Sequence, residues 1–252
     1  QGFWFLKGRE KIINIRKERV QISKGKIKRA IYYVRFLKFV PFIRSISIAN
    51  SLSFYNAKKS SDIDLFIITQ KNRLWITRTS TALLLTALGV KRRKGRNNDP
   101  DRFCLSFFAT TKSLNLKSIY QYPFDPYLSF WIAGLKPIYG VATFGRFVTK
   151  NIWYKKELPN HQHKLIKTIP NKSFLGFLRF IVEKFINLLG ANSIDKWLYK
   201  WQSRMVIEGA DWDDVGIGII AKRQILKTHA HDKRQYFREK LKERLRENLK
   251  MV

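Results

Sequence analysis

Two aspartates, Asp62 and Asp64, stand one residue apart in the apolar run "DIDLFIIT". In a β-strand, residues two positions apart point to the same face, so we expect both carboxylates on one side while Ile63 and Leu65 point into the core. Two like charges this close repel each other, and either a raised pKa or a bound cation relieves the repulsion. Because hard divalent cations prefer carboxylate oxygens, the pair predicts a site for Mg²⁺ or Mn²⁺.

The residues that precede the aspartates extend the pattern. In "IANSLSFYNAKKSSDIDLFIIT", Asn50 and Ser51 open a turn-rich connection that leads into the expected strand. The stretch resembles the signature of the DNA polymerase beta-like nucleotidyltransferase superfamily, in which a Gly-Ser pair is followed about ten residues later by Asp-x-Asp. Most of the sequence from residue 1 to 160 is also similar to a group of uncharacterised bacterial nucleotidyltransferase-domain proteins.

This resemblance implies metal-assisted transfer of a nucleoside monophosphate from a nucleoside triphosphate to an acceptor, such as an RNA end. It implies catalytic and metal-binding roles for Asp62 and Asp64. In the family, the Ser and its adjoining backbone hold the triphosphate, and nearby cations are expected to add positive charge there. The residues expected to bind the nucleotide are Asn50, Ser51, Lys58, Lys59 and Arg73.

The sequence departs from the family signature at two positions. Asn50 stands where the family has Gly, and the next expected strand, "RFCLSFF", has Ser106 where a third carboxylate is usual. Asp99 and Asp101, in the loop before that strand, are candidate replacements. These departures keep a second hypothesis open, in which a catalytically impaired protein of the same fold binds nucleic acid or belongs to a ribonucleoprotein.

The charge of the chain favours a polyanionic partner. Its 50 Lys and Arg residues oppose 18 Asp and Glu, which gives a net charge of +32, while 45% hydrophobic residues indicate a folded protein. We expect nucleic acid, and RNA rather than DNA, as that partner. The residues expected to contact it are Lys91, Arg92, Arg93, Lys94 and Arg96. An anionic membrane surface is the third hypothesis, although it does not explain the aspartate pair.

The remaining sequence limits other kinds of site. Cys104 is the single cysteine, which excludes an intrachain disulfide and a Cys-based zinc site. Charged residues interrupt the apolar runs 74–90 and 174–189, so we expect no transmembrane segment. With no signal-peptide pattern at its start, the chain is expected to be cytoplasmic. His229 and His231 in "THAHD" could bind a metal, but a loop that caps the final helix through Asp232 is the favoured interpretation.

Hydrophobic periodicity predicts an α+β fold. An N-terminal basic helical segment (1–42) precedes a nucleotidyltransferase-like core with a small mixed β-sheet and following helices (43–157), and a helical C-terminal lobe (172–252) completes the chain. Strands are expected at 45–50, 63–69 and 102–110, and a turn at 134–140. A helix over 73–88 is expected to begin with Asn72 as its N-cap and to end at Gly89.

Overall fold

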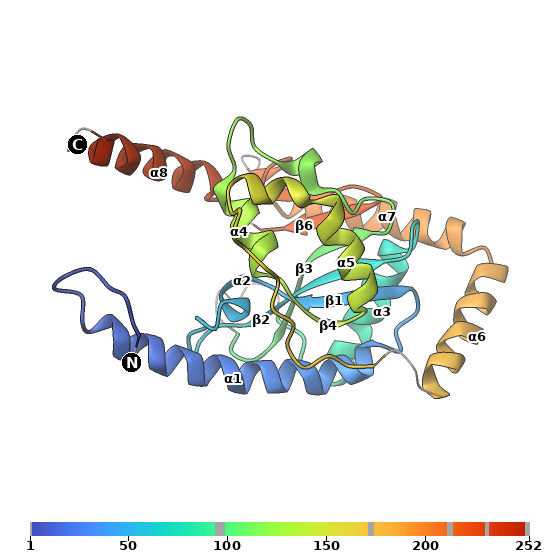
Figure 1. The fold of residues 1–252 in the computed structure, drawn as a ribbon. Coiled ribbons are helices and arrows are strands. Elements are labelled where there is room, and N and C mark those ends of the chain that lie inside the picture. Colours follow the sequence, from blue (N-terminus) through green and yellow to red (C-terminus); the bar gives the residue numbers. More distant parts are fainter. Residues whose placement is uncertain (1, 94–98, 171–173, 211–213, 230–231, 250–252) are drawn as a thin grey trace.

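A mixed sheet of six strands organises the described part of the chain, as the α+β prediction requires (Figure 1). The computed structural model describes residues 2–93, 99–170, 174–210, 214–229 and 232–249. The strands are β1 (Ile43–Ile48), β2 (Ile63–Thr69), β3 (Phe103–Thr110), β4 (Lys136–Tyr139), β5 (Ile219–Ala221) and β6 (Ile225–Thr228), in the spatial order β4-β1-β2-β3-β6-β5. Among the neighbouring pairs, β2 and β3 run parallel and the others antiparallel.

Helices cover both faces of this sheet. They are α1 (Ile12–Leu37), α2 (Asn50–Ser53), α3 (Leu74–Ala87), α4 (Pro126–Gly134), α5 (Val141–Lys150), α6 (Phe174–Leu188), α7 (Ala191–Glu208) and α8 (Arg234–Leu249), with the 3₁₀ turns η1 (Leu116–Ile119) and η2 (Ile152–Lys156). One hydrophobic cluster joins α1, α3 and α7 to the sheet, and a second joins α4, α5, η1 and η2 to it. In Figure 1, α8 extends away from the sheet toward the C-terminus, and α6 lies at the opposite side of the molecule.

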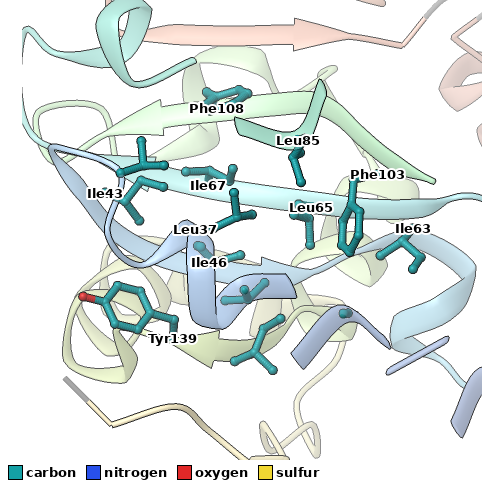
Figure 2. Close-up of a cluster of buried hydrophobic side chains, with 14 of the residues drawn as sticks. Leu37, Ile43, Ile46, Ile63, Leu65, Ile67, Leu85, Phe103, Phe108 and Tyr139 are labelled. Carbon is teal, nitrogen blue, oxygen red and sulfur yellow. The ribbon is translucent and has the colours of Figure 1, made fainter. Parts of the chain in front are cut away.

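Strand β2 is buried on both faces, which explains its nearly continuous apolar sequence. Ile63, Leu65 and Ile67 pack into the cluster of α1 and α3, which Figure 2 shows around them. Phe66 and Ile68 pack into the other cluster, beneath α4 and α5. Strands of parallel sheets are typically covered in this way, and burial of each large apolar side chain contributes about 1.5–3 kcal/mol to stability.

Helix α3 begins differently from the prediction. Asn72 is not its N-cap; its backbone has a φ of +58°, and its Oδ1 accepts a hydrogen bond from Gln224 Nε2 at 2.5 Å. The cap comes from Asp195 of α7, whose Oδ1 accepts from the amides of Trp75 (2.9 Å) and Ile76 (3.1 Å). A distant aspartate therefore satisfies two of the free amides of α3, and it ties α7 to the start of α3.

The end of α3 follows the prediction. Gly89, with a φ of +67°, lies just beyond the helix, and its backbone N–H donates to the carbonyl of Thr86 at 2.9 Å. A glycine adopts this left-handed conformation without the steric cost that a side chain would bring.

Two short segments of the C-terminal half differ from the prediction. Residues 134–140 were expected to form a turn, but Lys136–Tyr139 is the edge strand β4, where Pro137 is tolerated because an edge has free space beside its missing N–H. The lobe 172–252 was expected to be helical, but β5 and β6 belong to it and join the sheet beside β3. Strands of three or four residues are too short for periodicity to reveal.

Within the N-terminal segment, residues Ile12–Leu37 form the single helix α1. Its buried apolar residues pack into the cluster on the sheet, and four of its eight lysines and arginines are exposed, whereas Lys26 is buried.

The capping role of Asp195 gives a stability prediction. Asp195 is fully buried, so Asp195→Ala should lower the free energy of unfolding by about 1–3 kcal/mol, because the Trp75 and Ile76 amides lose their acceptor. Urea unfolding followed by circular dichroism measures this loss. Glu208→Ala on the same helix removes an exposed carboxylate and should change stability by less than about 0.5 kcal/mol. Equal stability of the two variants would contradict the capping role.

Candidate metal and nucleotide site

Asp62 and Asp64 lie at the start of β2 with Cys104 of β3 beside them. Parallel pairing sets Asp64 opposite Cys104, and the ligand atoms of Asp62, Asp64 and Cys104 all lie within 4.8 Å of one another. As predicted, Ile63 and Leu65 point into the hydrophobic cluster on the other face. The sheet therefore gathers two carboxylates and a thiol at one end of its central parallel pair.

Cys104, rather than Ser106, occupies the position beside the carboxylates. The register of β2 and β3 shifts between Asp64 and Phe66, so that β3 carries one extra residue before Phe107 pairs with Phe66. Ser106 instead faces His229, with 3.4 Å between its Oγ and the His229 Nε2. A bulge of this kind redirects side chains and leaves no trace in hydrophobic alternation.

The carboxyl of Asp64 carries most of the electrostatic cost of the cluster. Burial and, after it, the neighbouring Asp62 raise the pKa of Asp64 to about 7. Hydrogen bonds from the side chains of Asn50 and Cys104 and the charge of Arg92 oppose this rise but do not cancel it. Near neutral pH, a proton or a cation is therefore needed to stabilise Asp64.

Asn50, which stands where the nucleotidyltransferase signature has glycine, has an unusual backbone conformation. Its backbone has a φ of +55°, a left-handed conformation that Asn tolerates better than most residues. Its Oδ1 accepts a hydrogen bond from Trp131 Nε1 at 3.0 Å, while its side chain also hydrogen-bonds to Asp64. Asn50 thus links the carboxylate to α4.

Two further groups complete the surroundings of the pair. Burial, followed by the charges of Asp64 and Asp62, raises the pKa of the Cys104 thiol to about 12, so the thiol is neutral at pH 7. Arg92 places Nη1 at 3.0 Å from the Asp62 Oδ2 and donates to the Cys104 sulfur at 3.5 Å. The guanidinium therefore neutralises part of the negative charge of Asp62.

Neither of the two candidates for a third carboxylate, Asp99 and Asp101, belongs to the cluster. Asp99 accepts hydrogen bonds from the backbone N–H of Arg93 (2.9 Å) and from its guanidinium (2.8 Å). Asp101 pairs with Lys26, whose Nζ lies 2.6 Å from its Oδ1. These acids anchor the loop before β3 to its own cations and to α1.

The structure separates Arg73 from the other residues expected to bind the nucleotide. Ser51, Lys58 and Lys59 are exposed on α2 and in the loop that leads to the aspartates. Arg73 is buried beyond the opposite end of β2, roughly 20 Å away at about 3.3 Å per strand residue. There its guanidinium donates to Asn187 (2.8 Å) and Asn192 (2.6 Å). The assignment of Arg73 to the nucleotide site is corrected on this geometry.

The residues of the basic run 91–96, expected to contact nucleic acid, also differ in their surroundings. Lys91 is exposed, whereas Arg92 pairs with Asp62 and Arg93 with Asp99. Lys94 and Arg96 lie outside the described residues. Two of its arginines thus serve the protein's own carboxylates.

A pocket of about 170 Å³ opens beside Asn50, on the face of the sheet that carries the aspartates. Its walls come from α4, β3, β6 and the start of α8. The lining residues that matter for ligand binding are the aromatic side chains Phe107, Tyr127, Trp131 and Phe237 and the cations Lys227, Lys233 and Arg234. Stacking surfaces next to positive charge suit a nucleotide or another aromatic anion.

Sequence reasoning overlooked this pocket because its residues come from distant segments, although "THAHD" marked one of its edges. The capping interpretation of that segment is confirmed, since Asp232 Oδ1 accepts from the Arg234 amide at 2.9 Å. His229 lines the pocket, and burial together with Lys227 lowers its pKa to about 4, which keeps the ring neutral at pH 7. His231 lies outside the described residues.

Comparisons with known proteins were made at the level of family, sequence and structure. No family model, curated protein or solved structure matches this chain. The resemblance to nucleotidyltransferases therefore depends on Asn50, Ser51, Asp62 and Asp64 and on what surrounds them. Across the described residues, no helix is both long and apolar enough to cross a membrane.

The raised pKa of Asp64 predicts an unusual pH dependence. Because the folded protein binds this proton more tightly than the unfolded chain, whose carboxyl has a pKa near 3.8, stability should fall as pH rises from about 4 to about 7. Asp64→Asn should remove this part of the fall, while the exposed-site control Glu243→Gln should keep it. Thermal unfolding across this pH range, without divalent metal, measures the difference. Parallel profiles for the parent and Asp64→Asn would contradict the raised pKa.

Proposed function

We propose that this protein is a metal-dependent nucleotidyltransferase that moves a nucleoside monophosphate from a nucleoside triphosphate to an acceptor. The observation that supports the proposal is the carboxylate pair, Asp62 and Asp64, held on one face of β2 beside a pocket with aromatic and cationic walls. A structural strand position would gain more from two apolar side chains, because a buried carboxylate costs several kcal/mol unless it is compensated.

The donor groups fit a hard divalent cation. Asp62 and Asp64 offer carboxylate oxygens, and because burial and the neighbouring Asp62 raise the pKa of Asp64, a bound cation would stabilise its charged form. Mg²⁺ is commonly held by one or two protein carboxylates together with water and substrate phosphates, so a third acid is not required. The neutral, soft sulfur of Cys104 is a poor ligand for Mg²⁺, and its thiol instead supports Asp64 by a hydrogen bond. When bound, the ion would neutralise the triphosphate and stabilise the departing pyrophosphate.

The chain's own residues would bind and orient the nucleotide. In the pocket, Lys227 pairs with Asp232 at 2.6 Å, and Arg234 pairs with Asp232 and Asp125. Lys233 is exposed at the same wall, so the three cations exceed the two carboxylates by one positive charge. Tyr127 and Phe237, exposed and stacked with 5.9 Å between ring centroids, offer an aromatic surface in the same pocket. Positioning by such fixed groups supplies much of the catalysis of phosphoryl transfer.

A second candidate function is favoured by Arg92. Its ion pair with Asp62, at 3.0 Å, supplies part of the charge that a metal would otherwise supply. A protein with a permanently compensated pair could keep the fold and bind RNA through its basic surface without transferring nucleotides. This alternative is the nucleic-acid-binding or ribonucleoprotein component expected from the family departures.

A transfer assay separates the two functions. Purified protein is incubated with labelled nucleoside triphosphates, Mg²⁺ or Mn²⁺ and total cellular RNA. We expect Asp62→Ala/Asp64→Ala to lower label transfer on the order of a thousandfold, because a lost charge-stabilising contact commonly costs two to three orders of magnitude in rate. Glu208→Ala/Glu243→Ala, which also removes two carboxylates but at exposed positions, should retain the activity of the parent.

A different outcome of this assay would refute transfer to RNA. If neither the parent nor the aspartate variant transfers label, while both bind RNA with the same salt-sensitive affinity, transfer to RNA is refuted and the binding function takes its place. Titration of the parent with Mg²⁺ tests the metal separately. We expect Mg²⁺ to raise the melting temperature of the parent but not that of Asp62→Ala/Asp64→Ala, because only a folded site can bind the ion.

A further inference from the structure

Helix α6 is amphipathic, but its polar face points toward the protein and its apolar face points toward solvent. Arg179, Glu183 and Asn187, spaced four residues apart and hence on one face, point toward the protein. Arg179 Nη1 donates to the Lys38 carbonyl at 2.9 Å and to the Tyr139 hydroxyl at 2.6 Å. These contacts hold the polar face of α6 against the protein.

Glu183 and Asn187 extend this polar attachment. Glu183 Oε1 accepts from the backbone N–H of Phe42 at 2.7 Å, and Glu183 Oε2 lies 2.7 Å from Arg44 Nη2. Asn187 Oδ1 accepts from the buried Arg73 guanidinium at 2.8 Å. The five partners of these side chains are the Lys38 carbonyl, the Tyr139 hydroxyl, the Phe42 amide and the guanidinium groups of Arg44 and Arg73. They fix the rotation of α6 about its own axis, and this rotation leaves its apolar face outward.

The outward face forms what we call the α6 stripe, defined as Phe177, Ile181, Phe185 and Leu188. Their exposed fractions are 61%, 47%, 59% and 84%. On α7, Trp197 and Trp201 are exposed as well and stack on each other with 5.9 Å between centroids. Contiguous apolar surface of this kind on a helix marks an interaction site, because a solitary folded protein gains nothing from keeping it in water.

The positive charges around the α6 stripe indicate which kind of partner would bind it. Lys184 of α6 and Lys196, Lys200 and Arg204 of α7 are exposed. Among the acids of these two helices, Glu183 and Asp195 are buried, and Glu208 pairs with Arg204 at 3.3 Å. A second copy of the chain, also at +32, would be repelled, whereas an anionic lipid surface would attract this region and bury the stripe.

We propose that helices α6 and α7 dock the protein on anionic phospholipid bilayers. Helix α6 lies in the plane of the interface with the α6 stripe among the acyl chains, while the cations of α6 and α7 meet the phosphate headgroups. Trp197 and Trp201 occupy the headgroup level, where tryptophan is enriched in membrane proteins. This docking is independent of the proposed transfer activity.

Vesicle flotation tests the docking. The parent should float with vesicles made of an equimolar mixture of phosphatidylcholine and phosphatidylglycerol, and not with phosphatidylcholine alone. Ile181→Gln/Phe185→Gln/Leu188→Gln, which keeps helix-forming residues, should lower the partition coefficient by roughly tenfold or more. The control Leu83→Gln/Ile152→Gln/Leu165→Gln removes three equally exposed apolar side chains elsewhere (66%, 55% and 60%) and should bind like the parent.

A second measurement does not depend on how well the triple variant folds. Brominated phosphatidylglycerol should quench the tryptophan fluorescence of the parent, and Trp197→Phe/Trp201→Phe should lose most of that quenching. Unchanged flotation of the stripe variant would show that charge alone binds the vesicles, and would overturn the proposal. It is also overturned if the parent does not float but forms a dimer in sedimentation that the stripe variant breaks, because a second copy then covers the stripe.

Discussion

The parallel pairing of β2 with β3 is the constraint on which the rest of the structure depends. It sets Asp64 opposite Cys104, and it buries the central strands on both faces. A parallel pair needs a crossover, which α3 supplies, and helices on each side of the sheet, which α1, α4 and α5 supply. Two carboxylates at the end of such a pair are held rigidly, because the strand that carries them is fixed by a core on each face.

A small number of neighbouring groups compensates the negative charge of the two aspartates at that end of the sheet. Asp62 forms an ion pair with Arg92, whereas Asp64 accepts hydrogen bonds from the neutral side chains of Asn50 and Cys104 and gains less from the charge of Arg92. The two aspartates are therefore not equivalent. Asp62 is compensated within the chain, whereas Asp64 needs a charge from outside it, and this asymmetry distinguishes the pair from two ordinary surface acids.

The sequence predicted an element correctly where residues close together along the chain determine its structure. A run rich in apolar and β-branched residues located β2 at Ile63–Thr69, and a glycine just past the last turn located the end of α3. It failed where a distant group replaces a local one. Asp195 caps α3 in place of Asn72, and no local signal distinguishes the two.

In the candidate site, too, the sequence predicted what local geometry determines and missed what distant segments contribute. The aspartates were predicted because strand geometry alone puts them on one face. Ser106 was expected beside the aspartates, but Cys104 pairs with Asp64 and a register shift follows that pair. Arg73 was misplaced because proximity along the chain does not measure distance along a strand. The pocket residues of β6 and α8, among them Lys227 and Arg234, come from a segment whose strands are too short to be recognised.

The attachment of Arg73 to Asn187 and Asn192 has a geometric consequence for access. It fixes α6 and α7 beyond the end of β2 that lies farthest from Asp62 and Asp64. A surface that covers the α6 stripe therefore contacts the side of the molecule where Figure 1 shows α6, whereas Asp62 and Asp64 lie at the other end of β2. Under the two proposals, an acceptor such as an RNA would approach the carboxylates from the end of β2 that lies away from α6 and α7, so the acceptor and a bilayer would contact different parts of the surface.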